Sequence, residues 1–182
     1  MSNMKNIKDW FIPNVMFRVR EGDKHEDGGC SFGEGGWINK TTDDYFKGKR
    51  VVLFSLPGAF TPTCSSVQLP DYESKYQEFK DKGIDEVYCL SVNDSFTMNA
   101  WFDQWKIKNV KPIADGNGHF TRRMGMLVNK THLGFGMRSW RYAAVINDGK
   151  VEQWFEEPGI NDTGQDDDPY GQSSPSNVLT NI

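Results

Sequence analysis

The sequence is poor in cysteine and histidine, and these residues lack the spacings that build disulfide frameworks or zinc sites. The three cysteines, Cys30, Cys64 and Cys89, include no C-x-x-C pair. A disulfide-stapled secreted fold normally has an even number of cysteines. A structural zinc site needs four cysteine or histidine ligands at short spacings, whereas the histidines here stand apart, at His25, His119 and His132. We therefore expect neither a metal nor a cofactor.

Long apolar runs and an excess of positive charge are also absent. No run approaches the roughly 20 residues that span a bilayer, and residues 1–10 lack the apolar stretch of a signal peptide. The net charge of -4 offers no basic surface for nucleic acid or for an anionic membrane. We expect a cytoplasmic protein whose partners are neither nucleic acids nor membranes.

The length of 182 residues, without internal repeat or long linker, predicts a single domain over residues 1–182. Its first half has two short apolar runs, 51–56 and 87–92, which predict strands buried on both faces. Between them we expect a helix over about 64–82, ended by Gly83 and kinked at Pro70. The residues expected on its inner side are Val67, Tyr72, Tyr76 and Phe79.

The second half predicts further short elements and one hairpin. Asn93, Asp94 and Ser95 supply cap residues for a helix whose apolar stripe is Met98, Trp101, Phe102 and Trp105. The turn signal Asp148-Gly149 predicts a hairpin between 141–146 and 151–156. Smaller elements are expected as a strand at 111–114 and helices at 119–126 and 176–182, with an exposed loop at 22–36 between two early extended pieces. This pattern is α/β, with a mixed central sheet flanked by helices in a thioredoxin-like arrangement.

Cys64 has a chemically favourable position, because it follows a buried strand and opens a helix. A thiol in the first helical turn lies near unpaired backbone N–H groups and the positive end of the helix dipole. Both favour the thiolate, which is the nucleophilic form. Thr61 lies one helical turn upstream and can face the same pocket. Pro57 and Pro62 stiffen the loop and can shield the thiolate from water.

The segment from Pro57 to Cys64 reads P-G-A-F-T-P-T-C. It resembles the P-x-x-x-T-x-x-C motif of peroxiredoxins, in the form typical of their type II, or peroxiredoxin-5-like, branch. Further agreement lies at 91–94, 114–116 and 136–142, so the resemblance covers roughly residues 10–160. The chain is also similar to the peroxiredoxin half of bacterial peroxiredoxin–glutaredoxin fusions, although no C-P-x-C motif follows it here.

The resemblance implies a thiol peroxidase that reduces hydrogen peroxide and alkyl hydroperoxides. Cys64 would attack the peroxide and become a sulfenic acid. Thr61 would accept a hydrogen bond from the hydroperoxide, Pro57 would shape and dry the pocket, and the backbone N–H groups of Thr63 and Cys64 would complete the donor set. Arg141 would hold the thiolate and stabilise charge on the departing oxygen, with Arg138 as a second candidate in poorer register.

The family resemblance also implies a homodimer packed near the active-site loops, with Phe60 and the Trp101 helix as contributors. For regeneration of Cys64, the spacing of Cys89 is shared with plant-like type II relatives in which that cysteine can resolve the sulfenic acid. Its place in a buried strand equally indicates core packing, and residues 157–182 contain no later resolving cysteine. We therefore expect a one-cysteine cycle completed by glutathione with glutaredoxin, or by thioredoxin.

Other functions fit the sequence less well. A cysteine hydrolase needs a histidine base, and no histidine lies in a recognisable motif. A disulfide oxidoreductase would carry C-x-x-C, which is absent. The non-enzymatic alternative is a redox sensor or relay that binds a partner through oxidised Cys64.

Overall fold

The centre of the computed structural model, which describes residues 7–20 and 36–182, is a five-stranded mixed sheet of order β5-β4-β3-β8-β9. Strands β3 (Arg50–Ser55), β4 (Glu86–Ser91) and β5 (Lys111–Ala114) run parallel. Strand β8 (Tyr142–Asn147) is antiparallel to β3, and β9 (Lys150–Glu156) is antiparallel to β8. Cys30 and nearly all of the expected 22–36 loop lie outside the described residues.

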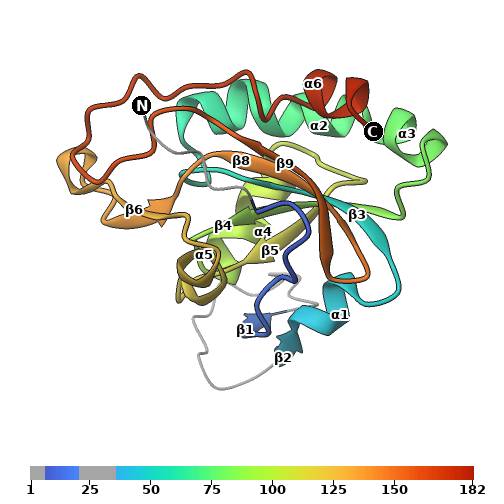
Figure 1. Cartoon of the computed structure of the whole chain (residues 1–182). Helices are drawn as coiled ribbons and strands as arrows, with labels where there is room; N and C mark the ends of the chain where they lie inside the picture. Colours follow the sequence, from blue (N-terminus) through green and yellow to red (C-terminus); the bar gives the residue numbers. More distant parts are fainter. Residues whose placement is uncertain (1–6, 21–35) are drawn as a thin grey trace.

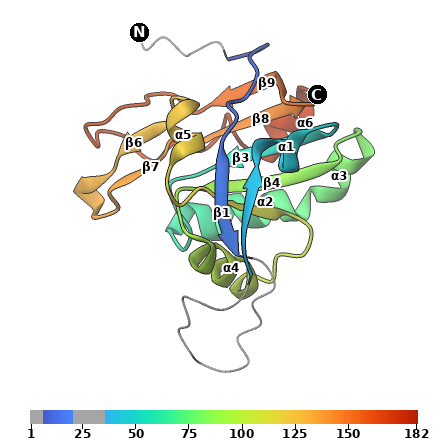
Figure 2. The ribbon, with the colours of Figure 1, turned by 90° about the horizontal axis from the view of Figure 1, so that it is seen from below.

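Two layers cover this sheet (Figure 1). One face carries α2 (Leu69–Ser74), α3 (Tyr76–Asp81) and α6 (Pro175–Thr180). The view from below shows the other layer in front, with α4, α5 and the β1–β2 hairpin (Figure 2). The bounds on that side are β1 (Met16–Arg20), β2 (Trp37–Thr41), α1 (Thr42–Phe46), α4 (Ser95–Gln104) and α5 (His119–Arg123). The expected α/β class, a thioredoxin-like fold with a mixed sheet, is confirmed.

Aromatic side chains join each layer to the sheet. On one face the ring of Phe54 stacks on Tyr72 with centroids 3.8 Å apart, and Tyr72 stacks on Phe79 at 5.8 Å. Burying rings of this size contributes on the order of 2–3 kcal/mol each. This stack fixes α2 and α3, and with them the segment that begins at Cys64, against β3. A second cluster fills the opposite face with Phe17, Tyr45, Phe46, Tyr88 and Phe120.

The helix expected over 64–82 is divided into three pieces. A π-helical turn η1 (Cys64–Gln68) comes first, and α2 and α3 meet at a break at Lys75. Pro70 has no N–H, so the regular α-helical bond at that residue cannot form. The wider turn lies directly before it, where the Leu69 N–H donates to the Cys64 carbonyl. The irregularity is therefore a π turn before Pro70 and a break after it, and Gly83 ends the segment as expected with φ 79°.

The π turn also changes which residues face inward. Tyr72 and Phe79 are fully buried and Tyr76 packs against the core, but Val67 is 45% exposed. The prediction that Val67 lies on the inner side was wrong, because the wider turn changes the angular spacing that an α-helix would have given.

Several short elements differ from the sequence expectation. The helix α1 and the hairpin of β6 (Leu127–Asn129) and β7 (Met137–Ser139), joined through η2 (Thr131–Leu133), were not expected. Helix α5 ends at Arg123 rather than 126, and α6 covers Pro175–Thr180. The 141–156 hairpin is confirmed, with Asp148 and Gly149 at φ 48° and 80° in its turn. Within the described ranges, no helix is long and apolar enough to cross a membrane.

The contrast between Val67 and Leu69 tests which residues of this helical segment face the core. Leu69 is fully buried, whereas Val67 is 45% exposed. Leu69→Ala should lower the free energy of unfolding by about 3 kcal/mol because it leaves a cavity. Val67→Ala should change it by less than about 0.5 kcal/mol. Urea denaturation followed by tryptophan fluorescence measures both, and equal losses would place Val67 in the core.

Candidate active site

Cys64 lies at the start of η1, where the chain has left β3 and passed through the loop at 56–63. Its side chain is only 1% exposed. The guanidinium of Arg141 lies beside it, and its Nη1 is 3.6 Å from the Cys64 Sγ and donates to it. The structure therefore brings together the two residues that the sequence predicted as nucleophile and charged partner.

Arg141 is held from several sides although it is itself 2% exposed. Its Nη1 also donates to Gln68 Oε1, and its Nη2 forms an ion pair with Asp168. The ring of Tyr170 lies 5.7 Å from the centre of the guanidinium. Burial alone would lower the pKa of Arg141, but the negative charges of Cys64 and Asp168 outweigh it and raise that pKa. The arginine is thus charged at every physiological pH.

The loop before Cys64 is fixed by its own polar groups. Thr61 Oγ1 donates to the Gly58 carbonyl at 2.7 Å, so its lone pairs stay available as acceptors. The Ala59 N–H donates to Asn93 Oδ1 at 3.0 Å, which ties the loop to the end of β4. Pro57, in the same loop, is buried. Thr61 and Pro57 thus both lie in the loop that leads to Cys64, with Pro57 buried and Thr61 partly exposed.

Arg138 lies elsewhere in the site. Its Nε donates to the Phe135 carbonyl at 3.0 Å and its Nη1 to the Val92 carbonyl at 3.2 Å. A Cβ on Gly58 would lie 3.1 Å from that Nη1, so Arg138 packs behind the loop. Partial burial lowers the pKa of Arg138. Of the two candidate arginines, Arg141 is the one that contacts Cys64.

The aromatic residues near this loop divide between surface and interior. Phe60 is 44% exposed and packs edge-on against Trp105 with centroids 5.8 Å apart. Trp101 is fully buried, and its Nε1 donates to the Ser65 hydroxyl at 3.0 Å. Trp101 therefore supports the residue next to Cys64 from inside the chain, and its side chain does not itself reach a partner subunit. Phe60 and Trp105 are the aromatic residues that reach the surface here.

Three residues around Arg141 were missed by sequence reasoning. Gln68 follows Cys64 by about one helical turn, and that spacing was a usable signal. Asp168 and Tyr170 lie in an acidic, turn-rich segment far along the chain. Neither periodicity nor a motif connects that segment to Cys64, so only the tertiary structure shows the contact.

Cys89 has the environment of a core residue. It lies in β4 opposite Phe54 of β3 and is fully buried. Complete burial, followed by the nearby Cys64, raises the pKa of Cys89 well above its usual value. Cys64 and Cys89 are both free thiols in the structure.

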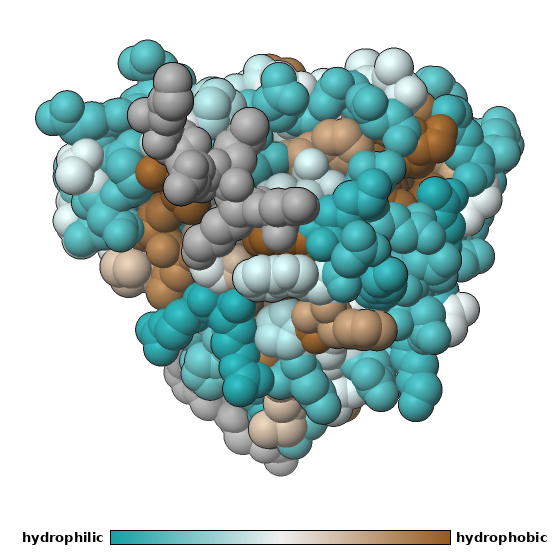
Figure 3. Space-filling model, in the orientation of Figure 1, coloured by the Kyte–Doolittle hydropathy of each residue, from teal (hydrophilic) through white to brown (hydrophobic). Residues whose placement is uncertain are grey.

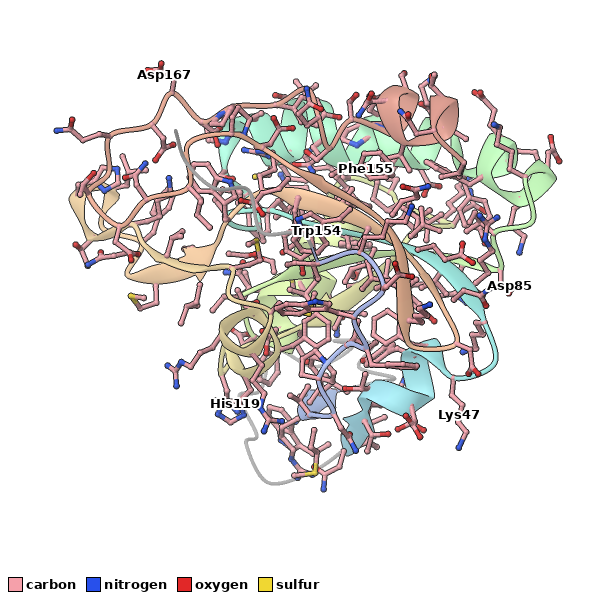
Figure 4. All side chains as sticks on the ribbon, viewed as in Figure 1. Lys47, Asp85, His119, Trp154, Phe155 and Asp167 are labelled. Carbon is pink, nitrogen blue, oxygen red and sulfur yellow. The ribbon has the colours of Figure 1, made fainter. Side chains whose placement is uncertain are left out.

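The two described histidines do not lie beside Cys64. His119 begins α5, on the opposite side of the sheet from α2 (Figure 4). His132 lies in η2, next to Gly164. Among residues 7–20 and 36–182, no group of three or more metal-ligating side chains gathers. The site as described contains a cysteine, an arginine and hydroxyl and amide groups, and it lacks the histidine that a cysteine hydrolase requires.

The chain is similar to known proteins in both sequence and fold. The Redoxin family model matches residues 33–171. A peroxiredoxin from Rhizobium etli is 62% identical over 168 residues, which cover 92% of each chain. The hybrid peroxiredoxin hyPrx5 from Haemophilus influenzae is 46% identical over 98% of this chain and 66% of its own length. The crystal structure of a Plasmodium falciparum antioxidant protein, described as a 1-Cys peroxiredoxin, superposes with a TM-score of 0.86 at 35% identity, covering 96% of this chain and all of that one.

The environment of Cys89 predicts that it is unreactive in the folded protein. Because its pKa is raised, the thiolate forms only at high pH, and burial also blocks access. In a Cys30→Ser background, iodoacetamide at neutral pH should leave Cys89 unmodified until urea unfolds the chain. Peptide mass mapping measures the modification. Equal rates in the folded and unfolded protein would contradict the prediction.

Proposed function

The chain belongs to the peroxiredoxin family of thiol peroxidases, and we propose that it reduces hydrogen peroxide and alkyl hydroperoxides through Cys64. The observation that carries the proposal is the buried pair of Cys64 and Arg141, with Sγ and Nη1 3.6 Å apart at the start of a helical segment. A fixed positive charge at that distance favours the thiolate over the thiol.

In the proposed reaction, the Cys64 thiolate attacks the terminal oxygen of the hydroperoxide. Sulfur supplies the electron pair for the new S–O bond, and the O–O bond breaks. The departing alkoxide or hydroxide takes up a proton and leaves as an alcohol or water. Sulfur is thereby oxidised to a sulfenic acid while the peroxide is reduced.

The neighbouring residues have roles that their geometry supports. The Thr61 hydroxyl donates to Gly58, which leaves it free to accept a hydrogen bond from the hydroperoxide. Arg141 and the backbone N–H groups of Thr63 and Cys64 stabilise the negative charge that grows on the leaving oxygen. Pro57, which is buried in the same loop, helps to shape the site and to keep water from it.

For the return to the thiol, we propose a one-cysteine cycle. An external thiol attacks the sulfenic sulfur, releasing water and forming a mixed disulfide, and a second thiol then frees Cys64. Glutathione with glutaredoxin, or thioredoxin, would supply these thiols. The burial and raised pKa of Cys89 support an external partner over this internal one. The similarity to a structure described as a 1-Cys peroxiredoxin points the same way.

We also propose that the chain acts as a homodimer packed near the active-site loop. The exposure of Phe60, 44% in the single chain, supports this surface, because a large aromatic side chain is favoured at an interface.

Turnover and intact mass test the cycle together. Cys64→Ser should abolish hydrogen peroxide consumption with either reducing system, and Cys89→Ser should retain it. One equivalent of peroxide without reductant should add about 16 Da to both wild type and Cys89→Ser, as a sulfenic acid requires. A loss of about 2 Da that appears only when Cys89 is present would instead establish an internal disulfide. Slow peroxide consumption by the wild type with both systems would overturn the peroxidase proposal in favour of a redox sensor.

Arg141 should matter far more than Arg138. Arg141→Met removes the charge beside Cys64, so the rate of peroxide reduction should fall by about a hundredfold. The pH at which that rate is half-maximal should rise, because the thiolate loses its stabilising charge. Arg138→Met is the matched control and should react as the wild type does. Stopped-flow measurement of peroxide consumption across pH distinguishes them, and equal effects would remove Arg141 from its proposed role.

A further inference from the structure

The C-terminal segment Asp166–Tyr170, which we call the strap, crosses the active-site arginine. Its Asp168 carboxylate pairs with Nη2 of Arg141, whereas Cys64 contacts the other terminal nitrogen, Nη1. We infer that Asp168 is a positioning residue, which holds Arg141 so that Nη1 faces the reacting sulfur. The inference rests on the proposed peroxidase function and adds a residue to it.

The strap is anchored upstream by a buried ion pair. Lys130 Nζ lies 2.5 Å from Asp166 Oδ2, and their side chains are only 4% and 7% exposed. The ring of Trp140 lies 5.0 Å from the same ammonium. The other oxygen of Asp166 accepts the Asp168 N–H at 3.0 Å. A charge buried this deeply is retained only where its partner is well placed, so Lys130 fixes Asp166 and, through it, the backbone of Asp168.

Downstream anchors hold the other end of the strap. Tyr170 donates from its hydroxyl to Asp71 Oδ2 at 3.3 Å, while its ring covers the guanidinium. Just beyond, the backbone N–H groups of Gly171 and Ser173 both donate to Glu157 Oε1 at 2.7 Å. Asp168 is thus held between two fixed points on either side of Arg141.

The backbone at Asp168 is bent to reach the arginine. Its φ is 49°, in the left-handed region that non-glycine residues rarely occupy. Such a conformation costs on the order of 1 kcal/mol and persists where the surrounding contacts impose it. Here those contacts place the Asp168 carboxylate against Nη2 of Arg141.

The hydrogen bonds of Arg141 show why this contact matters. Gln68 and Cys64 share Nη1, Asp168 takes Nη2, and Nε is buried without a hydrogen-bond partner among the described residues. A guanidinium is a rigid planar fork, so fixing both terminal nitrogens fixes its orientation. Without Asp168 the fork is fixed at one nitrogen and can rotate away from the sulfur.

Charge and orientation predict opposite results when Asp168 loses its carboxylate. Arg141 donates to Cys64, and Asp168 pairs with Arg141. The next carboxylates are Asp71, which accepts from the Tyr170 hydroxyl, and Glu157, whose backbone N–H donates to the Arg141 carbonyl. Neither is changed by a substitution at Asp168. If Asp168 acted only through its charge, its removal would favour the thiolate and lower the half-maximal pH. If Asp168 positions Arg141, removing the carboxylate must weaken the contact between Arg141 and the Cys64 sulfur and raise the half-maximal pH.

The adjacent Asp167 provides a matched control. Its side chain points away from the ribbon into solvent (Figure 4), over a part of the surface that is hydrophilic (Figure 3). Asp168→Asn and Asp167→Asn therefore remove the same charge from neighbouring residues, and only the first touches Arg141. Asparagine tolerates a positive φ about as well as aspartate, so the backbone is retained.

The experiment measures two rates for each variant across pH: alkylation of Cys64 by iodoacetamide, and oxidation of Cys64 by hydrogen peroxide. Asp168→Asn should slow oxidation by about tenfold and move both half-maximal pH values upward, while Asp167→Asn should match the wild type. Asp168→Glu should restore part of the rate. Lys130→Met should act in the same direction, and adding it to Asp168→Asn should cause little further loss, since both act through one chain of contacts.

The outcomes separate this inference from the proposed function. A downward or unchanged half-maximal pH in Asp168→Asn, or equal effects in the two asparagine variants, would overturn the positioning role. If the wild type reacts with peroxide no faster than free cysteine, the peroxidase proposal fails instead. The alkylation profiles do not depend on peroxide, and in that case they still decide whether Asp168 orients Arg141.

Discussion

A buried guanidinium next to a buried thiol is the constraint on which this site depends. Removing an arginine from water costs several kcal/mol unless charges and hydrogen bonds replace the lost hydration. Arg141 meets that requirement with Cys64 and Gln68, which begin and end η1, and with Asp168 from a distant part of the chain. The Cys64 sulfur is one member of this set, so the contacts that make the buried arginine tolerable also hold its guanidinium beside the proposed nucleophile.

The sheet brings the pair together through strand register. Strand β8 is antiparallel to β3, with Tyr142 opposite Ser55, so the residue before β8 lies beside the residues that follow β3. That residue is Arg141, and the loop after β3 leads to Cys64. The tight turn at Asp148 and Gly149 and the stack of Phe54 on Tyr72 hold the two sides of this arrangement. A shift of one residue in the register would turn Arg141 to the other face of the sheet.

Much of the fold and of the site could be predicted from local sequence signals. The features that could not be predicted depend on contacts between distant parts of the chain. The buried strands, the hairpin turn and the P-x-x-x-T-x-x-C segment can each be recognised from a few consecutive residues. The π turn at η1 depends on how Pro70 is accommodated, and it moved Val67 to the surface against the α-helical pattern. Asp168 was missed because its partner lies in a distant part of the chain, and an acidic run in a turn-rich segment usually indicates only a solvated loop.

The two described cysteines show how one fold gives the same side chain opposite chemistry. Both are almost completely buried, at 1% for Cys64 and 0% for Cys89, so burial alone does not separate them. Cys64 has a guanidinium within hydrogen-bond reach, whereas Cys89 has apolar neighbours and the nearby negative charge of Cys64 itself, both of which oppose its ionisation. A thiolate at Cys64 therefore suppresses one at Cys89. For an internal disulfide to form, Cys89 would have to ionise where the fold most disfavours it, and this is the physical reason for expecting the reducing thiol to come from outside the chain.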